Sequence, residues 1–77
     1  MKILFFGRLG ETIGREIEVE LPAGGCTVAA LRARLAEDHR GLEAANVRAC
    51  IDRAMVAETA RILPGQEVAF VPPLSGG

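Results

Sequence analysis

An α+β fold, with one main helix across one face of a mixed sheet of four to five strands, is predicted by three features of the 77-residue sequence. Short apolar or alternating runs, which are typical of strands, stand at both ends of the chain. One alanine-rich stretch with helical spacing lies between them. Hydrophobic residues make up 49% of the chain, which is enough for a core, although this length allows only one domain.

The N-terminal part is predicted to form a hairpin of two strands. The first strand is predicted over residues 2–6, which are apolar except for Lys2. Residues 15–21 alternate polar and apolar side chains, so that isoleucine, valine and leucine face inward and the glutamates face water. Glycines punctuate residues 7–14 between the strands, and we therefore expect a loop there.

One helix is predicted to follow the hairpin. Thr27 is a good N-cap, because its hydroxyl oxygen can accept a hydrogen bond from a free amide of the first turn. Val28, Leu31 and Leu35 follow at helical spacing, and Gly41 is placed to end the helix. This apolar stripe can be buried only against the sheet, which predicts two layers.

Three further strands are predicted in the second half of the chain. The third strand spans residues 47–51, and a turn joins it to a short fourth strand at residues 54–57. Pro64 and Gly65 mark a turn before the last strand, residues 67–71. The order strand, strand, helix, strand, short strand, strand, with the last strand free to enter the middle of the sheet, is typical of the β-grasp fold of ubiquitin-like proteins.

Two prolines separate this domain from the C-terminal end of the chain. Pro72 and Pro73 end the last strand, because proline has no N–H to donate to a neighbouring strand. We therefore assign residues 1–73 to the β-grasp domain and residues 74–77 to a flexible tail.

Charge and cysteine content exclude several classes of function. Nine basic and ten acidic residues balance, which argues against a nucleic-acid binder and against an electrostatic membrane anchor. The apolar runs are too short for a signal peptide or a membrane helix, so we expect a cytoplasmic protein. Cys26, Cys50 and His39 are too few for a metal site and form no catalytic signature. We expect the two cysteines to be reduced, with a disulfide between them as the less favoured alternative.

The predicted sheet has apolar side chains on both faces. Period two places Phe6 and Val71 on the face that the single helix does not cover, and Met55 of the short fourth strand is a third candidate. An exposed apolar patch of this kind usually marks a surface for a partner. The alternative is that Phe6 folds against residues 7–14 and covers itself.

The C-terminal Gly76 and Gly77 are suited to a reaction at the end of the chain. Glycines have no Cβ, so an extended Gly-Gly end can pass through a narrow channel. The α-carboxylate of Gly77 is ionised at neutral pH and is a poor electrophile. It becomes reactive after attack on the α-phosphate of ATP, which gives an acyl-adenylate.

The segments MKILFFGRL with Gly14, near the start, and VAFVPPLSGG, at the end, resemble the small subunit of molybdopterin synthase, the MoaD family. The resemblance spans the whole chain and implies a carrier with no bound cofactor. It implies that a ubiquitin-activating-like adenylyltransferase uses ATP to adenylate Gly77, and that sulfur then replaces AMP to give a thiocarboxylate. The tail would enter the large subunit and pass sulfur to cyclic pyranopterin monophosphate, which forms the dithiolene of molybdopterin.

The resemblance also implies a heterotetramer, in which two small subunits flank a dimer of large subunits. The family often has an arginine where this sequence has Gly10, so a contact made by that arginine would fall to Arg8. The partner contacts implied are Phe6, Met55, Val71, Leu74 and Ser75.

Two alternatives remain open at this point. The first is a sulfur carrier for tRNA thiolation or thiamine synthesis, which uses the same Gly-Gly chemistry with another acceptor. The second is a β-grasp interaction module without covalent chemistry, for which the Gly-Gly end would be incidental.

Overall fold

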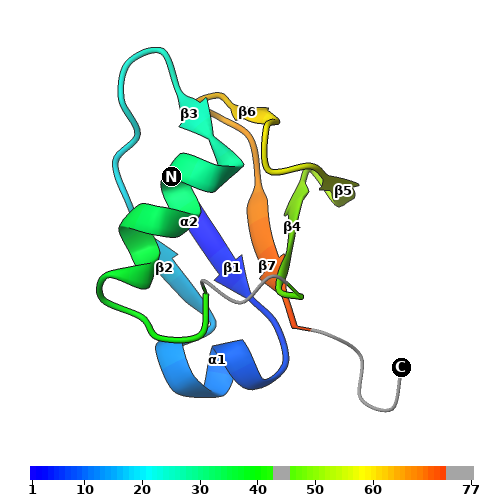
Figure 1. Ribbon diagram of the computed structural model, residues 1–77. Coiled ribbons are helices and arrows are strands. Elements are labelled where there is room, and N and C mark those ends of the chain that lie inside the picture. The colour runs from blue at the N-terminus through cyan, green and yellow to red at the C-terminus, as the bar shows by residue number, and fades with distance from the viewer. Residues whose placement is uncertain (43–45, 73–77) are drawn as a thin grey trace.

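The structure, a computed structural model, describes residues 1–42 and 46–72 (Figure 1). In this part of the chain, α2 (Val28–Ala36) lies across a five-stranded sheet whose strand order is β2-β1-β7-β4-β5. The strands are β1 (Lys2–Phe5), β2 (Glu16–Glu18), β4 (Arg48–Ile51), β5 (Ala54–Val56) and β7 (Val68–Val71). The β-grasp prediction, with one main helix on a mixed sheet, is confirmed.

The last strand occupies the centre of the sheet, as the sequence predicts. β7 pairs in parallel with β1, where Ile3 lies opposite Val68 and Phe5 opposite Phe70. On its other side β7 pairs antiparallel with β4. Because β7 is bonded on both sides, the C-terminal end of the domain is held at the middle of the sheet.

The core lies between α2 and the sheet face that it covers. Val28, Leu31 and Leu35 of α2 are buried, as expected from their spacing. Phe5 and Phe70 stack below them, with ring centroids 5.9 Å apart. Burial of such side chains stabilises a fold by about 1.5–3 kcal/mol each.

The start of α2 agrees with the sequence, but its end does not. The Thr27 hydroxyl accepts a hydrogen bond from the Ala30 amide at 3.1 Å, which confirms the N-cap. The helix ends at Ala36, short of Gly41, and turns follow it, in which the amides of Asp38 and His39 both donate to the Leu35 carbonyl.

Four elements differ from the sequence-based expectation. Residues Arg8–Ile13, expected to be a loop, form the short helix α1, which Leu9 anchors by packing into the core. In addition, β3 (Cys26–Thr27) and β6 (Arg61–Ile62) form a small second sheet. The strand predicted over residues 15–21 is regular only over Glu16–Glu18, although Val19 and Leu21 still pack against the core.

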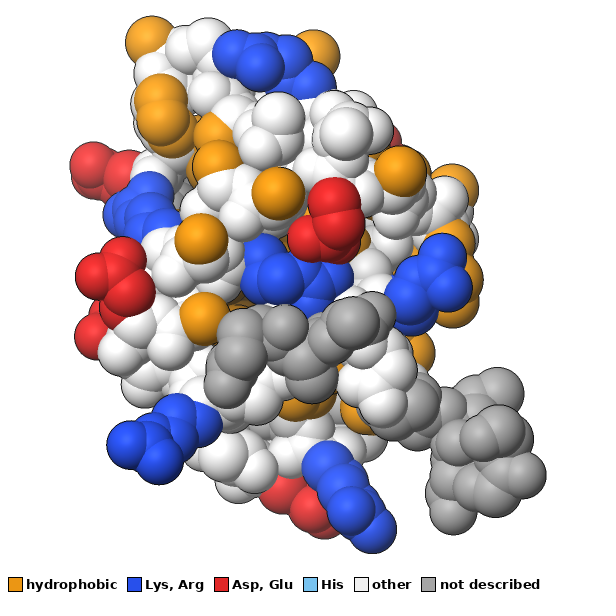
Figure 2. All heavy atoms as spheres, in the orientation of Figure 1, with side chains coloured by type: hydrophobic (Ala, Val, Ile, Leu, Met, Phe, Trp, Pro, Cys, Tyr) orange, Lys and Arg blue, Asp and Glu red, His pale blue; other side chains and the backbone are white. Residues whose placement is uncertain are grey.

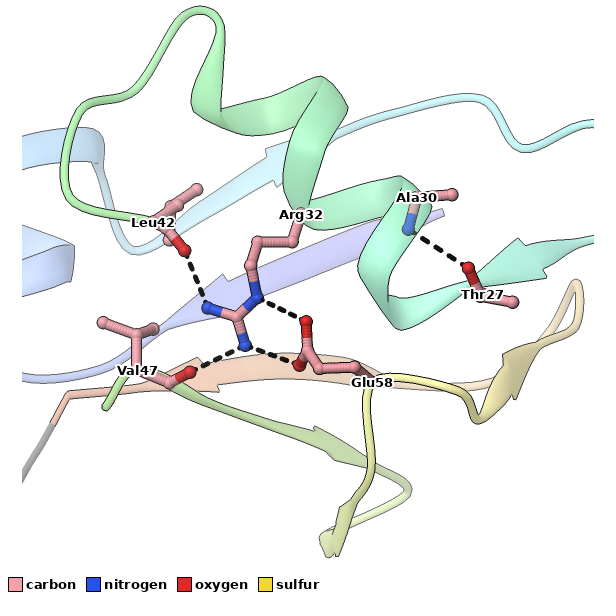
Figure 3. A network of polar contacts seen from close by, with 6 residues as sticks. All are labelled: Thr27, Ala30, Arg32, Leu42, Val47 and Glu58. Atoms are coloured by element: carbon pink, nitrogen blue, oxygen red, sulfur yellow. Dashed lines mark hydrogen bonds and ion pairs between the residues drawn. The ribbon is translucent and has the colours of Figure 1, made fainter. Parts of the chain in front are cut away.

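A partly buried arginine connects α2 to three other segments (Figure 3). The Arg32 guanidinium donates to the carbonyls of Leu42 and Val47, at 2.7 Å each. It also binds both carboxylate oxygens of Glu58 at 2.8 Å and lies 5.3 Å from the centre of the Phe70 ring. Because lysine cannot form this planar set of bonds, the site requires arginine.

Arg32→Lys is therefore expected to lower the free energy of unfolding by about 2–3 kcal/mol, because several charge-assisted hydrogen bonds are lost together. Urea unfolding of the variant measures this change. Arg34→Lys is the matched control, since the side chain of Arg34 makes a single, exposed hydrogen bond within the described residues, to the Glu20 carbonyl. Equal stability of the two variants would contradict a structural role for Arg32.

Candidate functional site

The sheet face opposite α2, here called the open face, carries a row of apolar side chains. Residues of β1, β4 and β7 that alternate with the buried core residues point to this face. The register places Leu4, Ala69, Cys50 and Met55 side by side across four strands. Phe6 and Met55 are among the most exposed large hydrophobic residues of the described chain, at 51% and 59%.

Two hollows adjoin this row. One, of about 440 Å³, is lined by Leu4, Phe6, Cys50, Arg53, Glu67 and Ala69. The other, of about 600 Å³, lies where β1 meets α1 and β2, and its lining includes Gly10, Arg15 and Glu16. Leu4 and Phe6 line both hollows, so they form the ridge between them. A ridge with a hollow on each side can interlock with side chains of another protein.

The C-terminal end of the domain lies beside this ridge. The Phe6 amide donates to the Phe70 carbonyl at 3.1 Å, so the residue that follows β1 is hydrogen-bonded to β7 near its end. Gly7 has a φ of +59°, and a Cβ there would lie 2.9 Å from Pro72 Cγ. Glycine therefore lets Pro72 pack closely on the turn after β1. Pro72, the last described residue at this end of the chain, therefore lies beside the turn that follows Phe6.

Charged side chains flank the apolar row at the β2 side of the sheet. Lys2 and Glu16 are 3.5 Å apart, and the N-terminal ammonium lies 2.6 Å from Glu18. The hydrogen-bonded ammonium lowers the pKa of the Glu18 carboxyl below its usual value. Because the pKa of Glu18 is lower in the folded protein than in the unfolded chain, this pair stabilises the fold fully at a pH above the pKa of the unfolded state. Its contribution is lost as the pH falls through the pKa of the folded state.

The turn between β4 and β5 has unusual backbone geometry. Asp52 and Arg53 have φ values of 49° and 71°, a region that favours glycine and strains other residues by about 1–2 kcal/mol each. Asp52 has a local reason to be there, because its carboxylate accepts a hydrogen bond from the Glu67 amide at 2.9 Å. Its own amide also donates to the Glu67 carbonyl at 2.8 Å.

The structure brings together some of the site residues expected from the sequence. Phe6 and Val71 lie near each other at the end of the two paired strands, and Met55 lies on the same face at the β5 edge. Phe6 remains half exposed, so it does not cover itself against α1. Leu74, Ser75, Gly76 and Gly77 lie outside the described residues, and so does the boundary between domain and tail.

Sequence reasoning missed two residues of the open face. Cys50 could have been found from its alternation with buried Ala49 and Ile51. Arg53 gave no periodic signal, because its position depends on the turn. Gly10, where the resemblance noted above implies an arginine, contributes to the larger hollow, while Arg8 is exposed on α1.

The opposite side of the molecule has a different character (Figure 2). Hydrophobic side chains there are scattered singly among Lys, Arg, Asp and Glu side chains, which is ordinary for a protein surface.

Within residues 1–42 and 46–72, no three His, Cys, Asp or Glu side chains are grouped closely enough to hold a metal ion. Across the same residues, none of the helices has the length and hydropathy needed to span a membrane.

Comparison with known proteins gives three results. The sequence matches the ThiS family over residues 3–77. It is 33% identical to the molybdopterin synthase sulfur carrier subunit of Escherichia coli (strain K12), covering 100% of this chain and 99% of the relative. The fold resembles SAMP1 from Haloferax volcanii, with a TM-score of 0.79, 25% identity, and coverage of 99% of this chain and 97% of the other.

A further solved structure contains a fold of this kind next to a second protein. It is the protein–protein complex of subunits 1 and 2 of the molybdopterin-converting factor from Helicobacter pylori. The match has a TM-score of 0.67 and 16% identity, and covers 99% of this chain and 96% of that chain. At this identity the likeness concerns the fold alone.

Proposed function

The chain belongs to the ThiS family, and from this premise we propose that it is the sulfur carrier subunit of a molybdopterin synthase. The observation that carries the proposal is the full-length similarity to the Escherichia coli sulfur carrier subunit. The family match extends to Gly77 and so includes the Gly-Gly end. The open face gives further support, because it offers an apolar surface that includes Phe6, which lies beside the turn on which Pro72 packs.

The proposed reaction takes place at Gly77. Its carboxylate oxygen attacks the α-phosphate of ATP on an activating partner, pyrophosphate leaves, and an acyl-adenylate forms. A sulfur nucleophile supplied through that partner then displaces AMP, which leaves a thiocarboxylate on Gly77. The glycines let the activating enzyme close around this anhydride without a side-chain clash. The chain is then a co-substrate, and its partners supply the acid, base and nucleotide chemistry.

Two protein partners follow from this proposal. The first is an adenylyltransferase related to ubiquitin-activating enzymes, which uses the ATP. The second is the large synthase subunit, which receives the tail and holds the pyranopterin. We propose that the open face binds the large subunit through Phe6, Met55 and Val71, in a heterotetramer with two carriers. The nearness of Phe6 to Pro72 supports this arrangement, because docking of the open face would also direct the tail.

Intact-mass analysis of the protein from its own cells tests the proposal. The expected result is a form in which one oxygen of the C-terminal residue is replaced by sulfur. Mixing this form with the large subunit and cyclic pyranopterin monophosphate should yield molybdopterin. A sulfur-bearing form that gives no molybdopterin, but thiolates tRNA or supports thiamine synthesis, would favour the alternative acceptors. Absence of the sulfur form would favour a non-covalent interaction module.

The sulfur is not expected to rest on a cysteine of this chain. Cys26 in β3 and Cys50 in β4 are free and half-buried, and both belong to strands of the domain and not to the C-terminal tail. The double variant Cys26→Ala, Cys50→Ala should therefore still accept sulfur on Gly77, which mass analysis after incubation with the activating enzyme would detect. Failure of a folded double variant to form the thiocarboxylate, under conditions where wild type forms it, would contradict this expectation.

A further inference from the structure

We propose that Arg53 is a docking residue, whose guanidinium pairs with a carboxylate of the large subunit while an apolar side chain of that subunit enters the 440 Å³ hollow. This inference rests on the proposed function and goes beyond it, because it assigns a charged contact and the chemistry of the surface that fits it. Three observations carry it: the backbone of Arg53, its lack of bonds within the fold, and its place in the hollow.

The backbone conformation shows that Arg53 is not the residue that the turn itself would favour. A two-residue hairpin turn with positive φ at both positions is adopted most easily with glycine second, as in Asn-Gly or Asp-Gly. Here the second position is arginine at a φ of 71°. Strain of this kind persists where the side chain has a role that offsets it, so the side chain of Arg53 needs an explanation.

The fold itself does not use this charge. Three arginines of the described chain are bonded within the fold: Arg32 to Glu58 and to carbonyls, Arg34 to the Glu20 carbonyl, and Arg61 to the Gly24 carbonyl. The side chain of Arg53 has no hydrogen bond or ion pair anywhere in residues 1–42 and 46–72. Within the same residues, the side chains of the exposed Arg8, Arg15, Arg40 and Arg48 have no such bond either, so Arg53 is distinguished from them by combining an unbonded charge with a strained backbone and a place in the smaller hollow. Its neighbour Asp52 is different, since Asp52 bonds to Glu67 and holds the turn against β7.

The place of Arg53 indicates what it could bind. It lines the smaller hollow together with four uncharged residues and Glu67, which is the other charged side chain there. A partner that covers the hollow would exclude water from Arg53, and a buried cation must then be paired. The partner surface that fits is an apolar side chain flanked by a carboxylate opposite Arg53. Charge pairs of this kind at an interface fix its register and speed association.

The experiment measures binding of the full chain to the large subunit of the same organism at low and moderate salt. Arg53→Gln should weaken binding about tenfold or more and should reduce its salt dependence, whereas Arg53→Lys should retain most of the salt dependence. Arg40→Gln is the matched control, because it removes the same charge from the exposed segment after α2. Its affinity should stay within about twofold of wild type.

Arg53→Gly separates docking from folding. Glycine relieves the strained φ, so this variant should melt at or above the wild-type temperature and still bind weakly. The inference is overturned if Arg53→Gln binds as tightly as Arg40→Gln at both salt concentrations. Wild-type protein that fails to bind the large subunit would instead contradict the proposed function, and the inference with it.

Discussion

Protein extended by one alanine after Gly77 is expected to bind the large subunit normally and yet to form neither an adenylate nor molybdopterin. The added residue lies beyond the domain, so the core and the open face stay unchanged. It moves the terminal carboxylate by about 3.5 Å, the length of one extended residue. Misplacement of a reacting group by about 1 Å can already lower a rate 100-fold, so the loss should be complete in practice.

Pyrophosphate release with the activating enzyme and molybdopterin yield with the large subunit measure the two losses separately. Gly76→Ala keeps the chain length and should act more weakly, because it only crowds the channel. Full conversion by the extended protein, with the extra alanine shown by mass to be still present, would refute the assignment of Gly77 as the working group.

The main elements could be predicted from the sequence because each has a local signal that tertiary structure reinforces. The buried stripe of α2 repeats at helical spacing, and Thr27 marks its start. The alternation in β1 and β7 placed Phe5 and Phe70 on one face and Phe6 and Val71 on the other. The central position of β7 followed from element order, since a β-grasp sheet requires it.

The elements that were missed lack such local signals. In α1, glycines at positions 7, 10 and 14 indicate a loop, because glycine lowers helix propensity by about 1 kcal/mol. Burial of Leu9 offsets this, and burial is a tertiary effect. β3 and β6 are two residues long each, too short to show a period, and their pairing joins residues far apart in sequence. Arg53 could be recognised as part of the open face only from the structure, because the turn between β4 and β5 places it in the lining of the smaller hollow.

The open face was predictable only in part, because some of its residues have a local signal and others do not. Phe6 and Val71 could be assigned to it from alternation, since neighbours of a buried residue along a strand face away from the core. Met55 was a candidate because the short fourth strand has little core to reach. The closeness of Phe6 to Pro72 could not be predicted in this way, because it depends on Pro72 packing against Gly7. The sequence therefore predicts which residues are available for a partner, whereas the structure shows that Phe6 lies beside the turn on which Pro72 packs.

Phe6→Ala is expected to weaken binding to the large subunit by about 30-fold, which corresponds to about 2 kcal/mol for an apolar anchor. Met55→Ala should act in the same direction. Both side chains are more than half exposed, at 51% and 59%, so their truncation leaves little cavity and the melting temperature should change little. Calorimetric titration with the large subunit and thermal unfolding of each variant measure the two quantities.

Leu63→Ala is the matched control for this prediction. Leu63 is a large hydrophobic residue with a similar exposure of 47%, but it follows β6 in the second sheet and is not part of the open face. General loss of surface hydrophobicity would weaken binding equally in all three variants, whereas a specific docking face requires that only Phe6→Ala and Met55→Ala lose affinity. A large fall in melting temperature for Phe6→Ala with unchanged affinity would assign Phe6 to the core, and the docking surface would then have to lie elsewhere.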